Sequence, residues 1–154
     1  MRITFIGAGS VGFTQKLVRD ILSVPELQDI EFSLQDISKD NLEMVKKLID
    51  KDISANGLPA KVLSSTDRAE ALAGARYVIN CSRIGGLEAF RHDIEIPLKY
   101  GVDQCVGDTV CAGGILYGQR SIPAILDFCK DIRSYAETDA LFLNYANPMA
   151  MNTW

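Results

Sequence analysis

The sequence lacks the features of several specialised classes of protein. It has no Cys-x-x-Cys pair, and its four cysteines are widely spaced: Cys81, Cys105, Cys111 and Cys129. This spacing argues against a zinc site or a disulfide framework and favours reduced thiols. No apolar run approaches the roughly 20 residues that span a bilayer, and Met1 leads directly into a predicted strand without the pattern of a signal peptide. We therefore expect a cytoplasmic chain without a membrane partner.

Charge of one sign is also scarce. The formal net charge is −4 and no Lys/Arg cluster occurs, so we expect no nucleic-acid partner. The only histidine, His92, lies among charged residues, which favours a solvated surface position over a role as acid or base. Hydrophobic content of 47% over 154 residues is typical of a globular protein, and a chain of this length fits one domain, residues 1–154.

The N-terminal stretch is an apolar run that breaks into Gly-x-Gly-x-x-Gly at Gly7, Gly9 and Gly12. A strand, a tight turn and a helix are predicted, with Ser10 and Val11 opening the helix. Gly7 permits the sharp turn, Gly9 permits close approach to a pyrophosphate, and Gly12 permits close packing of helix on strand. Because the N-terminus of a helix attracts anions, the stretch predicts dinucleotide binding.

The rest of the chain alternates predicted strands and helices, as in a parallel sheet covered on both faces. Strands are predicted at 30–36, 60–66, 75–81 and 140–145, and helices at 11–23, 39–56, 67–72, 87–100 and 121–136, the last with Pro123 in its first turn and Ile122, Ile125, Leu126, Cys129 and Ile132 as its buried face. Asp36 ends the second strand, where a dinucleotide fold binds the adenosine ribose and repels a 2′-phosphate. The alternative is that Asp36, beside Ser38, caps the following helix.

Polar loops follow the later strands. Residues 80–86 include Asn80 and Ser82, and we expect them near the nicotinamide end of a dinucleotide; a loop that only needs unusual glycine dihedrals is the alternative. Arg91 follows this loop and could hold a hydroxylated or anionic substrate.

Two further residues are candidates for the site. Residues 105–115 read as a functional loop whose one carboxylate, Asp108, could orient a catalytic group or instead form an Asx turn. Asn147 precedes a proline after the last predicted strand, so we expect its side chain at the crevice.

These residues carry a resemblance to glycoside hydrolase family 4, and the wording around Asp108 and Asn147 most resembles its α-galactosidase branch. The matching segments are Gly7-Ala8-Gly9-Ser10 with Asp36, residues 96–102, Gly107-Asp108-Thr109 with Gly113-Gly114, and residues 144–151. The resemblance covers the whole chain. It implies a Rossmann domain of the lactate/malate dehydrogenase-like type, with a doubly wound parallel sheet, that is truncated relative to the family and lacks its C-terminal catalytic and substrate domain.

The resemblance also implies the chemistry. Family members use NAD⁺ and a divalent metal, usually Mn²⁺, to hydrolyse glycosides: hydride leaves C3 of the sugar, a base removes the C2 proton, the aglycone leaves C1, water adds and the hydride returns. NAD ends the cycle unchanged. The full-length proteins are expected to be homo-oligomers.

The resemblance implies roles for three residues. Arg91 and Asn147 match positions that bind the sugar, and Asp108 matches a carboxylate that raises the basicity of the catalytic tyrosine. The metal ligands and that tyrosine lie beyond the matched stretch, so the chain is assigned no metal ligand, and we expect the chain alone to be inactive. Gly107-Asp108-Thr109 replaces the Gln-Glu-Thr of some phosphosugar relatives, which favours a non-phosphorylated hexoside. An NAD-dependent 2-hydroxy-acid dehydrogenase domain and a non-catalytic nucleotide-binding module remain alternatives.

Overall fold

The computed structural model describes residues 1–154, which fold into two compact units. The first unit comprises Met1–Cys81 and Asp131–Leu143, and the second comprises Ser82–Lys130 and Asn144–Trp154. The chain runs in the order β1 (Arg2–Ile6), α1 (Val11–Leu22), η1 (Pro25–Leu27), β2 (Glu31–Gln35), α2 (Lys39–Ala55), β3 (Lys61–Ser65), α3 (Arg68–Leu72), β4 (Tyr77–Asn80), α4 (Gly86–Leu98), α5 (Ala112–Tyr135), β5 (Leu141–Asn144) and α6 (Met149–Thr153).

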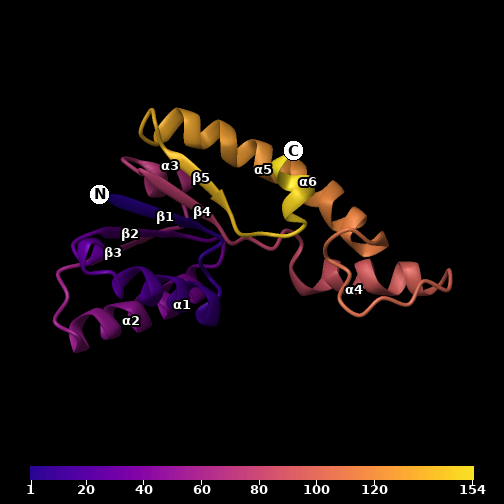
Figure 1. Ribbon diagram of the computed structural model, residues 1–154, viewed down its shortest axis with the longest axis horizontal. Helices are drawn as coiled ribbons and strands as arrows, with labels where there is room; N and C mark the ends of the chain where they lie inside the picture. The colour runs from indigo at the N-terminus through magenta and orange to yellow at the C-terminus, as the bar shows by residue number, and fades with distance from the viewer. The chain divides into compact units, whose positions relative to one another are not determined.

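The sheet of the first unit has the strand order β3-β2-β1-β4-β5 (Figure 1). β1 pairs in parallel with both β2 and β4, so that Phe5 lies opposite Leu34 on one side and Ile79 on the other. β2 pairs in parallel with β3. The reversal of strand order beside β1 is the mark of a doubly wound fold, and it confirms the α/β Rossmann-type fold expected from the sequence.

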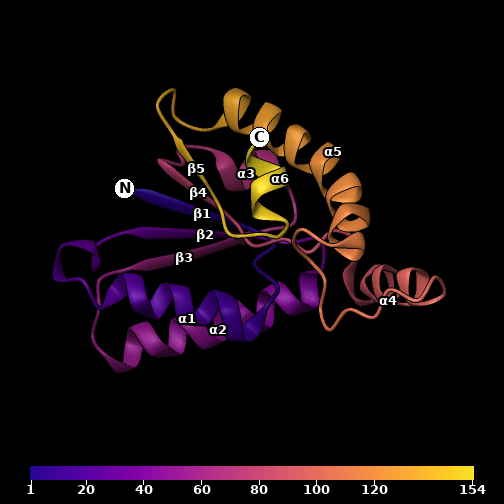
Figure 2. The same ribbon diagram turned by 45° about the vertical axis from the view of Figure 1, so that its right-hand side comes forward.

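The two faces of this sheet follow from the alternation of side chains along each strand. On one face, Phe5, Phe32 and Leu34 are fully buried in a core with Val18 from α1 and Val45 from α2. α1 and α2 run side by side over that face (Figures 1 and 2). On the other face, the buried Thr4 hydroxyl donates to the carbonyl of Ala71 in α3, with an oxygen–oxygen distance of 2.9 Å. Both faces are therefore covered, as the apolar strands predicted.

The second unit differs from its prediction at α5, which begins at Ala112 rather than near residue 121. The glycines that suggested a loop lie within this helix, at positions where neighbouring backbone leaves no room for a side chain. A Cβ on Gly113 would lie 2.6 Å from the Asp93 carbonyl oxygen, and one on Gly114 would overlap the Thr109 carbonyl. Pro123 consequently lies inside the helix, and its predicted place in the first turn is wrong.

The predicted buried face of this helix is only partly right. Ile125 and Ile132 are buried, whereas Ile122 and Leu126 are 37% and 58% exposed, and Phe128 is buried in their place. Together with Ile115, which is 49% exposed, Ile122 and Leu126 fall at helical spacing on one side of α5. This side of α5 therefore presents an exposed apolar stripe. No helix of the structure is both long and apolar enough to cross a membrane.

Candidate functional site

The turn between β1 and α1 has the geometry that its glycines predict at Gly7. This residue has a φ of 80°, a conformation that favours glycine. The amides of Gly7 and Ala8 both donate to the carbonyl of Gln35, at 2.9 Å each, and the hydroxyl of Thr14 donates to the carbonyl of Ala8 at 3.0 Å. The turn is therefore fixed to the end of β2 and to the helix it precedes. Thr14 is a supporting residue that the glycine spacing did not reveal.

Gly9 and Asp36 are brought together at the carboxyl ends of β1 and β2. The Gly9 amide donates to Oδ2 of Asp36 at 2.7 Å, and the Ser38 amide donates to Oδ1 at 2.9 Å. A Cβ on Gly9 would lie 2.7 Å from that same Oδ2 atom. Glycine is thus needed at this position to make room for the carboxylate. The residue that caps α2 is Ser38, whose hydroxyl accepts from the Asn41 amide, so Asp36 serves a different purpose from capping.

The N-terminus of α1 is open to an anion. Its N-cap residue, Ser10, makes no side-chain capping hydrogen bond, and the first turn holds no acidic residue. A Cβ on Gly12 would meet no atom within 4 Å, so the expectation that Gly12 allows close helix–strand packing is wrong. Val11 supplies that contact, packing against the core of the first unit. The space beside Gly12 lies instead at the N-terminus of α1, where the helix dipole attracts a phosphate.

At the end of β4, Asn80 is fully buried and Ser82 is half-buried, and both make contacts within the fold. Asn80 belongs to the first unit and Ser82 to the second. Between them, the Cys81 amide donates to the carbonyl of Ile6 at 2.8 Å. Burial raises the pKa of the Cys81 thiol to about 12, which keeps the thiol protonated and neutral at neutral pH.

In the second unit, a buried ion pair fixes the loop that precedes α4. Arg120 donates to both carboxylate oxygens of Asp93, at 3.0 and 2.7 Å, and Asp93 is only 3% exposed. The same guanidinium donates through Nε to the carbonyl of Ile84 at 2.9 Å. A Cβ on Gly85, which has a φ of 87°, would lie 2.8 Å from that Nε atom. The loop glycine is therefore required both by its dihedral and by the arginine that crosses it.

Arg83 is held in the same unit by aromatic rings. Its guanidinium carbon lies 4.2 Å from the ring centre of Phe90 and 5.2 Å from that of Tyr117. Its Nη1 atom is 3.8 Å from Oδ2 of Asp108, the predicted catalytic-site carboxylate. Burial raises the pKa of Tyr117, and the charge of Arg83 opposes that rise. Neither Arg83 nor Tyr117 was predicted from the sequence, because a lone arginine in a glycine-rich loop and a tyrosine in a helix carry no local signal.

The loop that carries Asp108 is tied down by Gln104. Its amide nitrogen donates to the Asp93 carbonyl at 3.0 Å, and its amide oxygen accepts from Gly113 at 3.1 Å. Gly107, with a φ of 65°, is crowded by the Gln104 side chain and by Sγ of Cys111. The loop is thus an ordered support for Asp108.

The other predicted substrate residues are more exposed. Arg91 pairs with Glu95 one turn further along α4, with 2.5 Å between Nε and Oε1, and its side chain is 73% exposed. Their hydrogen bond raises the pKa of Arg91 and lowers that of Glu95. His92 is exposed on the same helix, as predicted. Asn147 is half-buried and joined to Pro148 by a cis peptide bond.

The residues present do not supply a metal site, because no group of three His, Cys, Asp or Glu side chains gathers in the structure.

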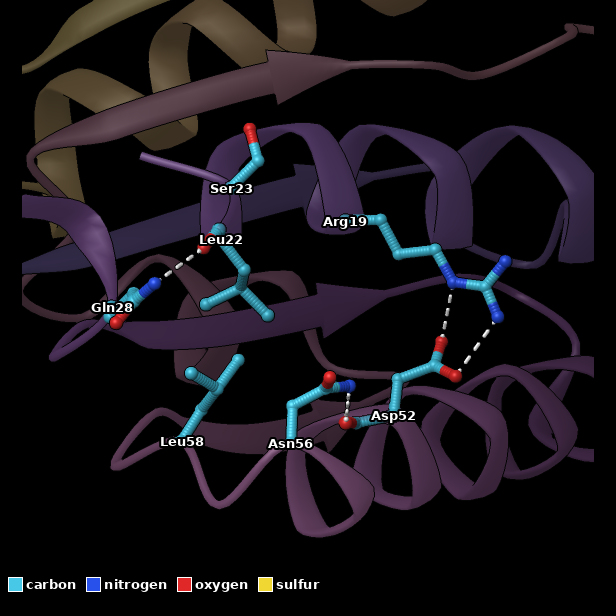
Figure 3. A pocket seen from close by; sticks show the side chains of 7 residues that line it. All are labelled: Arg19, Leu22, Ser23, Gln28, Asp52, Asn56 and Leu58. Carbon is cyan, nitrogen blue, oxygen red and sulfur yellow. Dashed lines mark hydrogen bonds and ion pairs between the residues drawn. The ribbon is translucent and has the colours of Figure 1, made fainter. Parts of the chain in front are cut away.

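One cavity, of about 220 Å³, lies in the first unit among Arg19, Leu22, Ser23, Gln28, Asp52, Asn56 and Leu58 (Figure 3). It is closed on one side by the two-fold hydrogen bond between Arg19 and Asp52. These residues lie in the C-terminal turns of α1 and α2 or just beyond them, so the cavity lies at the opposite end of both helices from the glycine turn and is not the dinucleotide site.

Comparison with known proteins agrees with this geometry. The model of the family "Family 4 glycosyl hydrolase" matches residues 2–154. An alpha-galactosidase of Rhizobium meliloti (strain 1021) is 69% identical over 153 residues, which are 99% of this chain and 31% of that protein. The chain thus spans about a third of the length of the curated relatives it matches.

Solved structures place the fold in the same group. A 6-phospho-beta glucosidase from Thermotoga maritima, crystallised with manganese, NAD+ and glucose-6-phosphate, superposes with a TM-score of 0.85 at 32% identity, over 96% of this chain and 35% of that one. Malate dehydrogenase from Naegleria fowleri ATCC 30863 superposes with a TM-score of 0.64 at 16% identity, over 99% of this chain and 40% of that one. The second likeness concerns the fold alone and confirms its dehydrogenase-like type.

Proposed function

The chain belongs to family 4 of the glycosyl hydrolases, and we propose that it is the NAD-binding part of an enzyme that hydrolyses α-galactosides or related α-hexosides. Identity of 69% to an alpha-galactosidase supports the substrate class. Replacement of the Gln-Glu-Thr of phosphosugar relatives by Gly107-Asp108-Thr109 supports a sugar without a 6-phosphate.

The observation that carries the cofactor proposal is the carboxylate of Asp36 beside the Gly9 amide, next to an α1 N-terminus without a capping side chain. Asp36 would accept hydrogen bonds from the ribose hydroxyls of NAD and would repel the 2′-phosphate of NADP. The open space at Gly12 and the amides of the first turn would receive the pyrophosphate. Asn80, the last residue of β4, and Ser82, two residues further on, would line the nicotinamide end.

The nicotinamide, when bound, supplies reversible hydride acceptance, which would oxidise the sugar at C3 and acidify its C2 proton. The residues of this chain would hold the sugar for that exchange. Arg91 and Asn147 would bind its hydroxyls, and Asp108 would raise the basicity of the tyrosine that takes the C2 proton. The chain offers no set of metal ligands for Mn²⁺, so the ions that relatives bind would need residues outside it. On this basis, the 154-residue chain alone turns over no glycoside.

Titration calorimetry with NAD⁺ and NADP⁺ tests the cofactor proposal. NAD⁺ is expected to bind at least tenfold more tightly, because a 2′-phosphate would have to lie beside the Asp36 carboxylate. Asp36→Asn is expected to remove most of this difference, while Asp40→Asn, at an exposed position in the first turn of α2, leaves it unchanged. Equal affinity of the unsubstituted chain for the two dinucleotides would remove Asp36 from the role.

An activity assay tests the second half of the proposal. The purified chain is mixed with an aryl α-galactoside, NAD⁺, Mn²⁺ and a thiol reductant, and release of the phenol is followed. No release above the rate without protein is expected. Cleavage at a rate proportional to the chain would show that its own residues suffice for catalysis.

A further inference from the structure

Arg83 has the properties of a binding residue that the fold has prepared. Its guanidinium lies over the rings of both Phe90 and Tyr117, which restrict its position. None of its N–H groups donates a hydrogen bond within the chain, in contrast to Arg120, whose Nε, Nη1 and Nη2 are all engaged. A positioned guanidinium with unused donors is a common way to bind oxygen-rich ligands.

The distance to Asp108 points to the kind of ligand. Nη1 of Arg83 and Oδ2 of Asp108 are 3.8 Å apart, which is too long for a direct hydrogen bond. A single ligand oxygen can lie within hydrogen-bond distance, about 2.8 Å, of both atoms at once, because two such bonds together are longer than the gap between the atoms. To serve both partners, this oxygen must accept from the guanidinium and donate to the carboxylate. A hydroxyl group does both, whereas a phosphate or carboxylate oxygen would be repelled by Asp108.

Both side chains are held in place for this purpose. The side chain of Asp108 is only 19% exposed and that of Arg83 is 36% exposed. Gln104 fixes the segment before Asp108 to the Asp93 carbonyl and to Gly113. A ligand hydroxyl would therefore enter a preformed pair of partners and pay little entropy for ordering them.

We propose that Arg83 and Asp108 form a hydroxyl-binding pair that holds one hydroxyl of the glycoside, with Arg83 as donor and Asp108 as acceptor. This inference rests on the proposed function, because it takes the ligand to be a sugar. It assigns Arg83 a substrate contact in addition to those of Arg91 and Asn147. It also makes the pair specific for neutral sugars at that hydroxyl, since the carboxylate rejects an anionic group there.

The experiment uses the ¹⁵N-labelled chain saturated with NAD⁺ and follows the arginine Nε–Hε signals while methyl α-D-galactoside is added. The Arg83 signal is identified by its loss in Arg83→Lys. The galactoside is expected to shift that signal in a saturable way, and Arg83→Lys is expected to weaken its binding about tenfold, because a hydrogen bond to a charged group is lost or misplaced. Arg133→Lys, at an exposed position near the end of α5, is the matched control and should bind unchanged.

Deoxy-galactosides identify the hydroxyl without any substitution in the protein, and they keep the test valid if Arg83→Lys does not fold. One deoxy analogue should bind about tenfold more weakly and leave the Arg83 signal unmoved, and its affinity should not depend on Arg83→Lys. Binding of all analogues with the same Arg83 shift would overturn the pair, as would galactoside binding without any Arg83 shift or no binding at all. A chain that fails to bind NAD⁺ would instead refute the proposed function itself.

Discussion

The two units are stabilised by different interactions. The first unit has a core of fully buried apolar side chains, such as Phe5, Phe32 and Leu34, from adjacent parallel strands. The second unit is organised around a buried carboxylate, Asp93, and the arginine that pairs with it. Apolar contacts are interchangeable among many partners, whereas an ion pair depends on two particular residues. Loss of either member of the Asp93–Arg120 pair should therefore cost the second unit more than a volume-conserving apolar exchange costs the first.

The largest expected effects separate these two modes of stabilisation. Asp93→Ala should lower the stability of the second unit by about 3 kcal/mol, because Arg120 loses its partner in a poorly solvated site. Leu34→Ala should lower the stability of the first unit by a similar amount, about 3 kcal/mol, through the cavity it creates. Amide hydrogen exchange, measured residue by residue, should locate each loss in its own unit. Asp93→Asn, which keeps one acceptor oxygen, should lose less than Asp93→Ala.

A smaller effect is expected within the glycine turn. Gly9→Ala should cost about 2 kcal/mol, because its Cβ would lie 2.7 Å from the Asp36 carboxylate and displace it. Gly12→Ala has open space around its Cβ and should unfold at the same urea concentration or slightly higher. If dinucleotide occupies that space, however, Gly12→Ala should weaken NAD⁺ binding in calorimetry. Equal destabilisation by the two substitutions would contradict the assignment of Gly9 to the Asp36 contact.

Helix capping in the first unit should give an effect of about 1 kcal/mol. Asp67 accepts from the amides of Ala69 and Glu70, at 2.8 and 3.2 Å, whereas the capping bond of Ser38 to Asn41 is 3.4 Å long. Asp67→Ala should therefore destabilise the chain more than Ser38→Ala, as measured by urea unfolding. The reverse order would show that capping geometry does not control the stability of these helices.

The smallest expected effect is on the pH dependence of stability, through titration of the Cys81 thiol, and it is absent at neutral pH. Because burial raises the pKa of Cys81 from 9.0 to about 12, the fold favours the protonated thiol. Its contribution to stability is complete below pH 9 and is lost as the pH rises through the folded-state pKa. The stability difference between the chain and Cys81→Ala should be constant below pH 9 and move in favour of the variant above it. Cys105→Ala, at an exposed thiol, should give a flat difference over the same range.

The first unit could be predicted from sequence because its signals are local. Apolar runs, helical spacing and glycine punctuation gave strands and helices whose bounds agree with β1–β4 and α1–α3 to within a few residues. The early position of α5 was missed because glycine ordinarily signals a turn, and the close approach of the Asp93 and Thr109 backbone that requires Gly113 and Gly114 is a matter of folded geometry, which residue types do not reveal. Gly12 was misjudged for the same reason, since the space around a helical glycine depends on its neighbours in the fold.

The glycine turn, the position of Asp36 and membership of a glycoside hydrolase family were therefore determined by the sequence alone, since each is carried by residue types at short spacing. Only the tertiary structure decided that Asp36 contacts Gly9 rather than capping α2. It also decided that Arg120 pairs with Asp93 and that Arg83 lies close to Asp108 and to the rings of Phe90 and Tyr117. Such contacts join residues many positions apart. Sequence analysis misses them because the charge and hydrogen-bonding groups of a residue show what kind of partner it needs, but not where in the chain that partner lies.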